Sequence, residues 1–108
     1  MGEAVWTLTE GGSEMTAIDM DKLRAEIDAI DKAMVELFNR RARCVLDIGR
    51  YKQQNRMAVY EPQRETVVMA NVARHNQGPL PNEELATIYT AILAAMRRLQ
   101  SPDVLERS

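Results

Sequence analysis

The sequence contains few glycine, proline, cysteine and aromatic residues, and these shortages narrow the classes of protein to which it can belong. Its 108 residues include five glycines, four prolines and one cysteine, and aromatic residues make up only 5%. Few glycines and prolines together with 45% apolar residues are typical of a helical protein. The lone Cys44 cannot form a disulfide within the chain, which agrees with a reducing compartment.

The chain has no excess of positive charge. Fourteen basic and sixteen acidic side chains give a net charge of -2, so neither nucleic acid nor an anionic membrane surface is the expected partner. No apolar run approaches membrane-spanning length, and residues 1–18 lack the charged start and apolar run of a signal peptide. We therefore expect a cytoplasmic protein, and the length fits one domain.

The hydrophobic pattern predicts an all-α fold with one long helix at about 21–55 and shorter helices at about 62–75 and 82–100. Residues 1–18 show no clear period and are predicted to be a flexible tail, and residues 102–108 a short C-terminal tail. The folded domain is thus expected at 19–101. Apolar residues recur in steps of four and three along one face of the long helix, at Leu23, Ile27, Ile30, Met34, Leu37, Cys44 and Ile48. We expect this face to be buried.

Two cations fall on this apolar face. Continuing the same steps reaches Arg41 and then Lys52, and eleven residues on a helix place them about 16 Å apart on nearly the same side. A charge on a buried face is costly unless it is paired or faces a polar cavity. The pattern is compatible with an anionic ligand that contacts both cations, and equally with ion pairs to carboxylates of another helix.

The other two helices carry further polar candidates. Gln100 lies one four-residue step beyond Met96 on the apolar face of the third helix, a neutral counterpart of the two cations. Glu61, Arg64 and Glu65 gather on one side of the start of the second helix. This cluster is also explained by helix capping and salt bridges alone.

The length of the first helix predicts self-association. At about 50 Å it has more apolar face than helices of roughly 20 and 28 Å are expected to cover. Arg24 lies about 25 Å along the helix from Arg41, too far for one small ligand to bridge within a chain. In an antiparallel dimer of this helix, Arg24 of one chain could approach Arg41 of the other.

Six short motifs in order give the chain a resemblance to a known family. They are Leu23-Arg24-x-x-Ile27-x-x-Ile30-Asp31, Arg41, Ile48-Gly49-x-x-Lys52, Tyr60-Glu61-Pro62-x-Arg64-Glu65, Asn76-x-Gly78-Pro79-Leu80-Pro81 and Leu99-Gln100. Over about residues 19–101 the chain resembles the all-helical class of chorismate mutases, most closely the form fused to prephenate dehydratase. The resemblance implies a three-helix protomer in an intertwined homodimer that rearranges chorismate to prephenate, on the way to phenylalanine and tyrosine.

The resemblance also implies roles for individual residues. Arg24 of the partner chain and Arg41 would bind the two substrate carboxylates. Lys52 would bind a carboxylate and the ether oxygen, and Gln100 would donate to the same oxygen. Glu65 would accept a hydrogen bond from the ring hydroxyl, with Glu61 and Arg64 lining the site.

These residue types suit an intramolecular pericyclic reaction, which requires no metal, cofactor or nucleophile. Arginine forks can hold a flexible dianion in its compact reactive conformation, and Lys52 and Gln100 can stabilise charge that grows on the ether oxygen. The chain departs from the family at Met96, where a small residue, often serine, is common. A hydroxyl contact to a substrate carboxylate would then be missing, and the pocket wall would be bulkier.

Other interpretations stay open at this point. A related helical fold performs isochorismate pyruvate lyase chemistry on a near-identical substrate, and the fold alone does not separate the two. The chain could also be a non-catalytic helical module for dimerisation or regulation. Either a prephenate dehydratase or a synthase would be compatible as a partner of a mutase domain.

Overall fold

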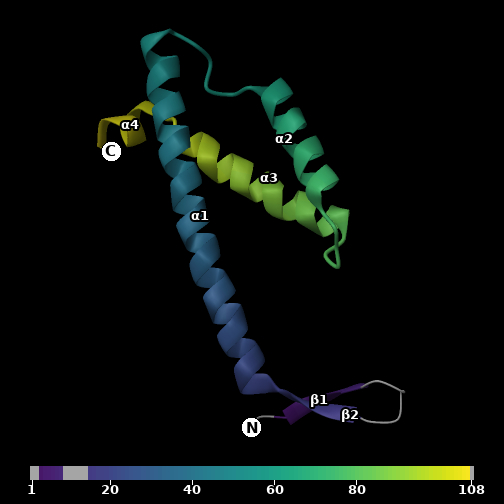
Figure 1. Cartoon of the computed structure of the whole chain (residues 1–108). Coiled ribbons are helices and arrows are strands. Elements are labelled where there is room, and N and C mark those ends of the chain that lie inside the picture. The colour runs from purple at the N-terminus through teal and green to yellow at the C-terminus, as the bar shows by residue number, and fades with distance from the viewer. Residues whose placement is uncertain (1–2, 9–14, 108) are drawn as a thin grey trace. The chain divides into compact units, whose positions relative to one another are not determined.

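The computed structural model describes residues 3–8 and 15–107, and the chain divides into two compact units, Met1–Asn39 and Arg40–Ser108. Helix α1, Met20–Gln54, begins in the first unit and ends in the second (Figure 1). Helices α2, Pro62–His75, α3, Asn82–Arg98, and α4, Pro102–Arg107, belong to the second unit. The predicted long helix and its two shorter companions are confirmed, with ends within two residues of those expected.

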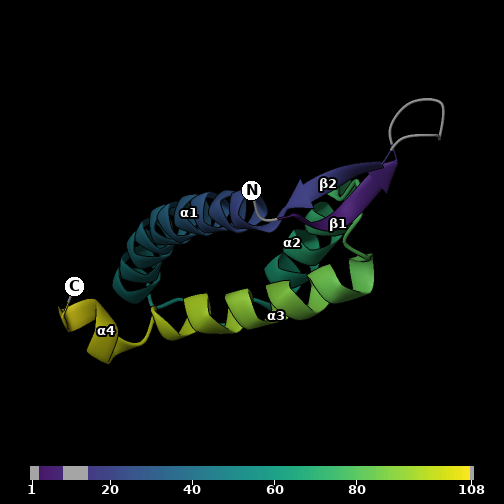
Figure 2. The same ribbon diagram turned by 90° about the horizontal axis from the view of Figure 1, so that it is seen from below.

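The first unit contains two strands that the sequence did not predict. Strand β1, Glu3–Leu8, and strand β2, Met15–Asp19, pair antiparallel (Figure 2). These segments are rich in β-branched and aromatic residues, but such short strands gain stability only from pairing, which a search for one period along the chain does not detect. The segment predicted to be a flexible tail therefore contains two strands that the sequence analysis missed. Residues 1–2 and 9–14 of that predicted tail lie outside the described part of the chain.

The start of α1 follows from its capping residue. Asp19 Oδ1 accepts a hydrogen bond of 3.2 Å from the backbone N–H of Lys22, as an acidic N-cap does. In the second unit, Pro62 occupies the first turn of α2, where its missing N–H matters least. The turn before α3 is held by Asn76, whose Nδ2 donates to Leu80 O at 2.8 Å and to Asn82 Oδ1 at 2.7 Å.

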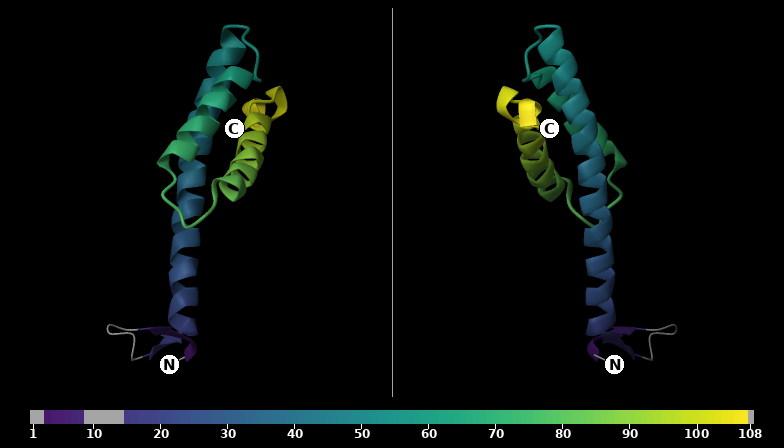
Figure 3. Two further views of the ribbon diagram at one scale, coloured as in Figure 1. Left: turned by 90° about the vertical axis from the view of Figure 1, so that its right-hand side faces the viewer. Right: turned by 90° about the vertical axis from the view of Figure 1, so that its left-hand side faces the viewer.

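Helix α4 lies where the sequence predicted a C-terminal tail. Ser101 Oγ accepts a hydrogen bond from the N–H of Val104, and Pro102 starts the helix. Leu105 is buried next to Gly49, so that α4 lies beside the C-terminal part of α1 (Figure 3). A helix of six residues is too short to show a period, which is why the prediction was wrong for residues 102–107. Ser108 is not among the described residues.

Little of the chain is buried. Among the residues whose burial is described, the apolar core consists of Val45, Leu93 and Leu105. Most of the apolar face predicted to be buried is instead between 40% and 55% exposed, namely Leu23, Ile27, Ile30, Met34, Leu37 and Ile48. Cys44, expected to be a small buried residue, is also exposed. The prediction of a buried face is thus wrong for the single chain, because the described elements of each unit leave that face uncovered.

No helix in the described part of the chain is both long and apolar enough to cross a membrane.

Candidate active site

The second unit contains a pocket of about 470 Å³ between the C-terminal part of α1, the segment that leads into α2, and α3. Apolar side chains that include Val45, Val68 and Leu93 form part of its wall. Its polar lining consists of Arg41, Lys52, Glu61, Arg64, Glu65, Arg97 and Gln100. Seven of the eight residues that the sequence singled out, Met96 included, therefore line one pocket, although they come from three separate stretches of the chain.

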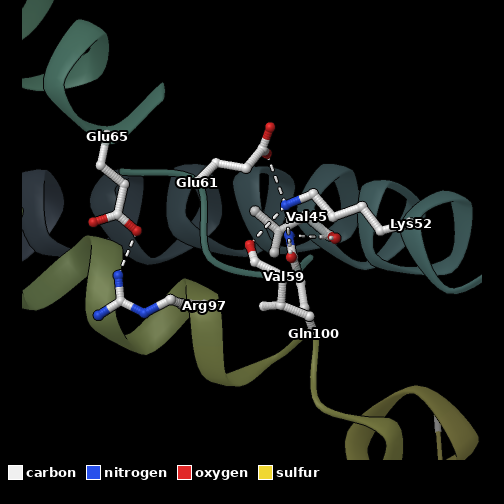
Figure 4. Close-up of polar contacts among 7 residues, drawn as sticks. All are labelled: Val45, Lys52, Val59, Glu61, Glu65, Arg97 and Gln100. Atoms are coloured by element: carbon white, nitrogen blue, oxygen red, sulfur yellow. Dashed lines mark hydrogen bonds and ion pairs between the residues drawn. The ribbon is translucent and has the colours of Figure 1, made fainter. Parts of the chain in front are cut away.

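Lys52 is the most buried charged residue of the pocket, with a relative exposure of 4%. Its Nζ donates to the backbone O of Val59 at 2.8 Å and forms an ion pair with Glu61 Oε2 at 2.7 Å (Figure 4). It also donates to Gln100 Oε1 at 3.1 Å. Three acceptors thus satisfy the three donors of the ammonium group, which explains how the charge is tolerated.

Gln100, just past the end of α3, is buried to 8% exposure. Because Lys52 can only donate, the amide oxygen of Gln100 must face it, and Gln100 Nε2 points toward Val45 O at 3.4 Å (Figure 4). The amide nitrogen has two hydrogens, so one remains for a ligand. A cationic donor and a neutral donor therefore lie next to each other in the pocket.

Arg41 differs from Lys52 in having no anionic partner. It is partly buried in the pocket wall, yet no carboxylate of the described residues lies within ion-pair distance of it. The same holds for Arg64, which is exposed at the pocket. The ion-pair explanation that the sequence left open therefore applies to Lys52 and not to Arg41. Two arginines without carboxylate partners in one pocket can bind carboxylates of a ligand.

Glu65 has a partner that the sequence analysis missed. Its carboxylate forms an ion pair with Arg97 of α3, and the guanidinium of Arg97 lies 4.9 Å from the centre of the Tyr60 ring (Figure 4 shows the ion pair). A signal was available, because Arg97 follows Leu93 by four residues and precedes Gln100 by three, on the same face of the helix.

Arg24 is the one predicted site residue that does not line the pocket. It lies on the exposed surface of α1 within the first unit. Within the described residues, no group of three or more His, Cys, Asp or Glu side chains could hold a metal ion. The pocket is thus positively charged and contains two buried hydrogen-bond donors, Lys52 and Gln100, a combination that suits a small dianion.

Comparison with known proteins decides the family. Residues 23–101, most of the chain, match the family described as chorismate mutase type II. The chain belongs to the chorismate mutase type II family. This family match includes all of α2 and α3 and most of α1, and hence every residue of the pocket described above.

Several proteins similar to this chain are named as mutases. A bifunctional chorismate mutase/prephenate dehydratase of Pseudomonas aeruginosa is 36% identical over 92 residues, 78% of this chain and 25% of that protein. A 4-amino-4-deoxychorismate mutase of Streptomyces pristinaespiralis is 35% identical over 83 residues, 75% of this chain and 64% of that protein. This chorismate mutase type II chain spans about a quarter of the length of the bifunctional relatives it matches.

A solved chorismate mutase structure shares the fold. The chorismate mutase of Helicobacter pylori, solved in complex with prephenate, has a TM-score of 0.73 against this chain and 29% sequence identity. The similarity covers 82% of this chain and 96% of that one. The all-helical mutase fold that the resemblance implied is therefore confirmed.

Proposed function

We propose that this chain is a chorismate mutase, which converts chorismate to prephenate, and that its catalytic domain is residues 19–101. The observation that carries this proposal is the buried donor pair of Lys52 and Gln100 in a pocket that also presents Arg41 and Arg64. Chorismate has two carboxylates, which the arginines can bind. It also has one ether bond to break, whose oxygen the donor pair can contact. The family membership of residues 23–101 supports the same assignment.

In the proposed reaction, the ether C–O bond breaks while a new C–C bond forms within the same molecule. Arg41 and, in the homodimer proposed below, Arg24 of the partner chain hold the two substrate carboxylates and favour the compact conformer in which the reacting carbons meet, and Arg64 lines the pocket beside them. Lys52 and the remaining amide hydrogen of Gln100 donate to the ether oxygen, where negative charge grows as the bond breaks. Met96 contributes wall and no hydrogen bond.

Binding of substrate to Lys52 requires one of its present acceptors to leave. Val59 O is part of the backbone, and Gln100 Oε1 belongs to a side chain that is buried. Glu61 is the acceptor that can move, because its side chain is 45% exposed and water can solvate its carboxylate once the ion pair with Lys52 is broken. We therefore expect Glu61 to be displaced from Lys52 when the substrate binds, while Glu65 accepts from the ring hydroxyl.

The active form is proposed to be a homodimer in which Arg24 reaches the partner's pocket. The exposed apolar face of α1 supports this, since Leu23, Ile27 and Ile30 are 40–55% exposed in the single chain. A contiguous apolar surface of this kind marks a protein interface. If the chain is part of a longer protein, as its bifunctional relatives are, a prephenate dehydratase could be its fused partner, and a separate synthase is compatible as well.

The proposal is tested by mixing purified protein with chorismate, following the loss of chorismate absorbance, and identifying the product. Prephenate should form, and Arg41→Ala should lower kcat/KM by about a hundredfold or more because a carboxylate loses its charged anchor. Arg43→Ala is the matched control, since Arg43 is exposed and does not line the pocket. A folded wild type that forms no prephenate would contradict the proposal and favour a non-catalytic module. Pyruvate formed from isochorismate would favour the lyase.

A further inference from the structure

Glu65 accepts from the ring hydroxyl in the proposed reaction, but its ion-pair partner Arg97 has been given no role so far. Both side chains line the pocket and are largely shielded from solvent, with exposures of 26% and 33%. Arg97 is held on a second side by the face of the Tyr60 ring, 4.9 Å from its centre. The pair is thus a fixed polar feature of the pocket wall, and its chemistry determines what a ligand can present to it.

The two groups demand complementary hydrogen bonds. The carboxylate of Glu65 can only accept, and the guanidinium of Arg97 can only donate. A hydroxyl placed against the pair satisfies both, because it donates one hydrogen bond and accepts another. An ammonium group in the same place has donors only, so it leaves Arg97 without an acceptor and brings two positive charges together.

The charges of the whole pocket point in the same direction. Within one chain, its lining has four cations, Arg41, Lys52, Arg64 and Arg97, and two carboxylates, an excess of two positive charges, to which Arg24 of the partner chain would add a third in the proposed dimer. An excess of positive charge favours a ligand with two carboxylates and no positive charge of its own. A ring amine that is protonated at neutral pH would reduce the ligand's charge to -1 and weaken this attraction.

We propose that Arg97 is a specificity-determining residue, which makes this site select a dicarboxylate with a ring hydroxyl over the analogue with a ring amine. The inference rests on the proposed function and deepens it by naming the substituent that the pocket distinguishes. Without Arg97, Glu65 would be an unpaired carboxylate in a partly buried wall, and a ring ammonium would be its natural partner. The alternative substrate is relevant because a relative that is 35% identical is a 4-amino-4-deoxychorismate mutase.

The test compares kcat/KM for chorismate with kcat/KM for 4-amino-4-deoxychorismate in the wild type, Arg97→Leu, Arg97→Lys and Arg98→Leu. We expect the wild type to prefer chorismate and Arg97→Leu to lower this preference by about tenfold or more, because the like-charge repulsion is gone. Arg97→Lys should keep the preference. Arg98→Leu should keep it too, since Arg98 is exposed, lies next in the chain and does not line the pocket.

The ratio of the two kcat/KM values is informative because partial unfolding of a variant lowers the activity on both substrates by the same factor. An unchanged ratio in Arg97→Leu would overturn the inference. The proposed function is judged separately by whether the wild type turns over chorismate at all. If it does not, the dissociation constants of prephenate and its 4-amino analogue, measured by calorimetry, provide the same ratio, and equal affinities or no binding would overturn the inference as well.

Discussion

Lys52 Nζ lies 3.1 Å from Gln100 Oε1, a contact between two buried side chains 48 residues apart in the chain. The contact orients the amide of Gln100, because its oxygen must face the ammonium group and its nitrogen must face away. One residue thereby positions the other, and the two act as a unit. Removing either should disturb both of the donors that we propose for the ether oxygen.

Replacing Lys52 should abolish most of the activity without unfolding the protein. In Lys52→Met the side chain keeps its length, and Glu61 remains hydrated because it is 45% exposed. Loss of the charged donor should lower kcat/KM by about 10²- to 10³-fold. The acceptors left behind should cost about 1–3 kcal/mol of unfolding free energy. Kinetics and thermal unfolding, with the exposed Gln53→Met as control, check both effects, and activity within a few-fold of wild type would refute the assigned role.

Gln100→Glu should restrict activity to acid pH. A carboxylate at this position repels the charge that grows on the ether oxygen and pairs with Lys52, whereas the protonated acid can still donate a hydrogen bond. Activity should therefore be higher at pH 5 than at pH 8. Gln100→Leu should be poor at both values, since it has no donor to restore. Equal activity of Gln100→Glu at the two pH values would show that Gln100 does not contact the reacting oxygen.

Gly49→Ala should affect activity more than stability. A Cβ at Gly49 would lie 3.0 Å from Gln100 Cγ and 3.2 Å from Leu105 Cδ2, both closer than ordinary contact. Alanine is the better helix former by about 1 kcal/mol, which offsets part of the crowding in the folding free energy. Gln100 cannot move without loosening its hydrogen bonds, so we expect kcat/KM to fall about tenfold from misplacement of its amide. A wild-type kcat/KM in this variant would show that Gln100 and Leu105 make room for the added methyl group without displacing the amide.

The role of Arg24 across the dimer interface can be tested by complementation. Arg24→Ala and Arg41→Ala should each be nearly inactive alone. In a mixture that has been allowed to exchange subunits, a mixed dimer regains one intact site if Arg24 acts in the partner's pocket. Random pairing then restores about one quarter of wild-type activity, because half of the dimers are mixed and each has one intact site of two. No recovery despite proven exchange would place Arg24 outside the site or within its own chain's pocket.

The sequence alone predicted the positions of α1, α2 and α3, because an amphipathic period is a local property that neighbouring residues repeat. It also identified Arg41, Lys52 and Gln100, since a polar residue on an apolar face breaks that period. The same approach missed β1, β2 and α4. These elements are short, and they depend on pairing or on one buried contact such as that of Leu105.

Only the tertiary structure decided which charges are paired. The sequence placed Lys52 and Arg41 on the same face, and a ligand or an ion pair could explain either cation. Folding gave Lys52 an anionic partner, whereas no carboxylate of the described residues pairs with Arg41. It also brought Arg97 to Glu65 and left most of the apolar face of α1 exposed. The physical reason is that ion pairs and burial depend on which side chains meet in space, across separations along the chain that no local pattern records.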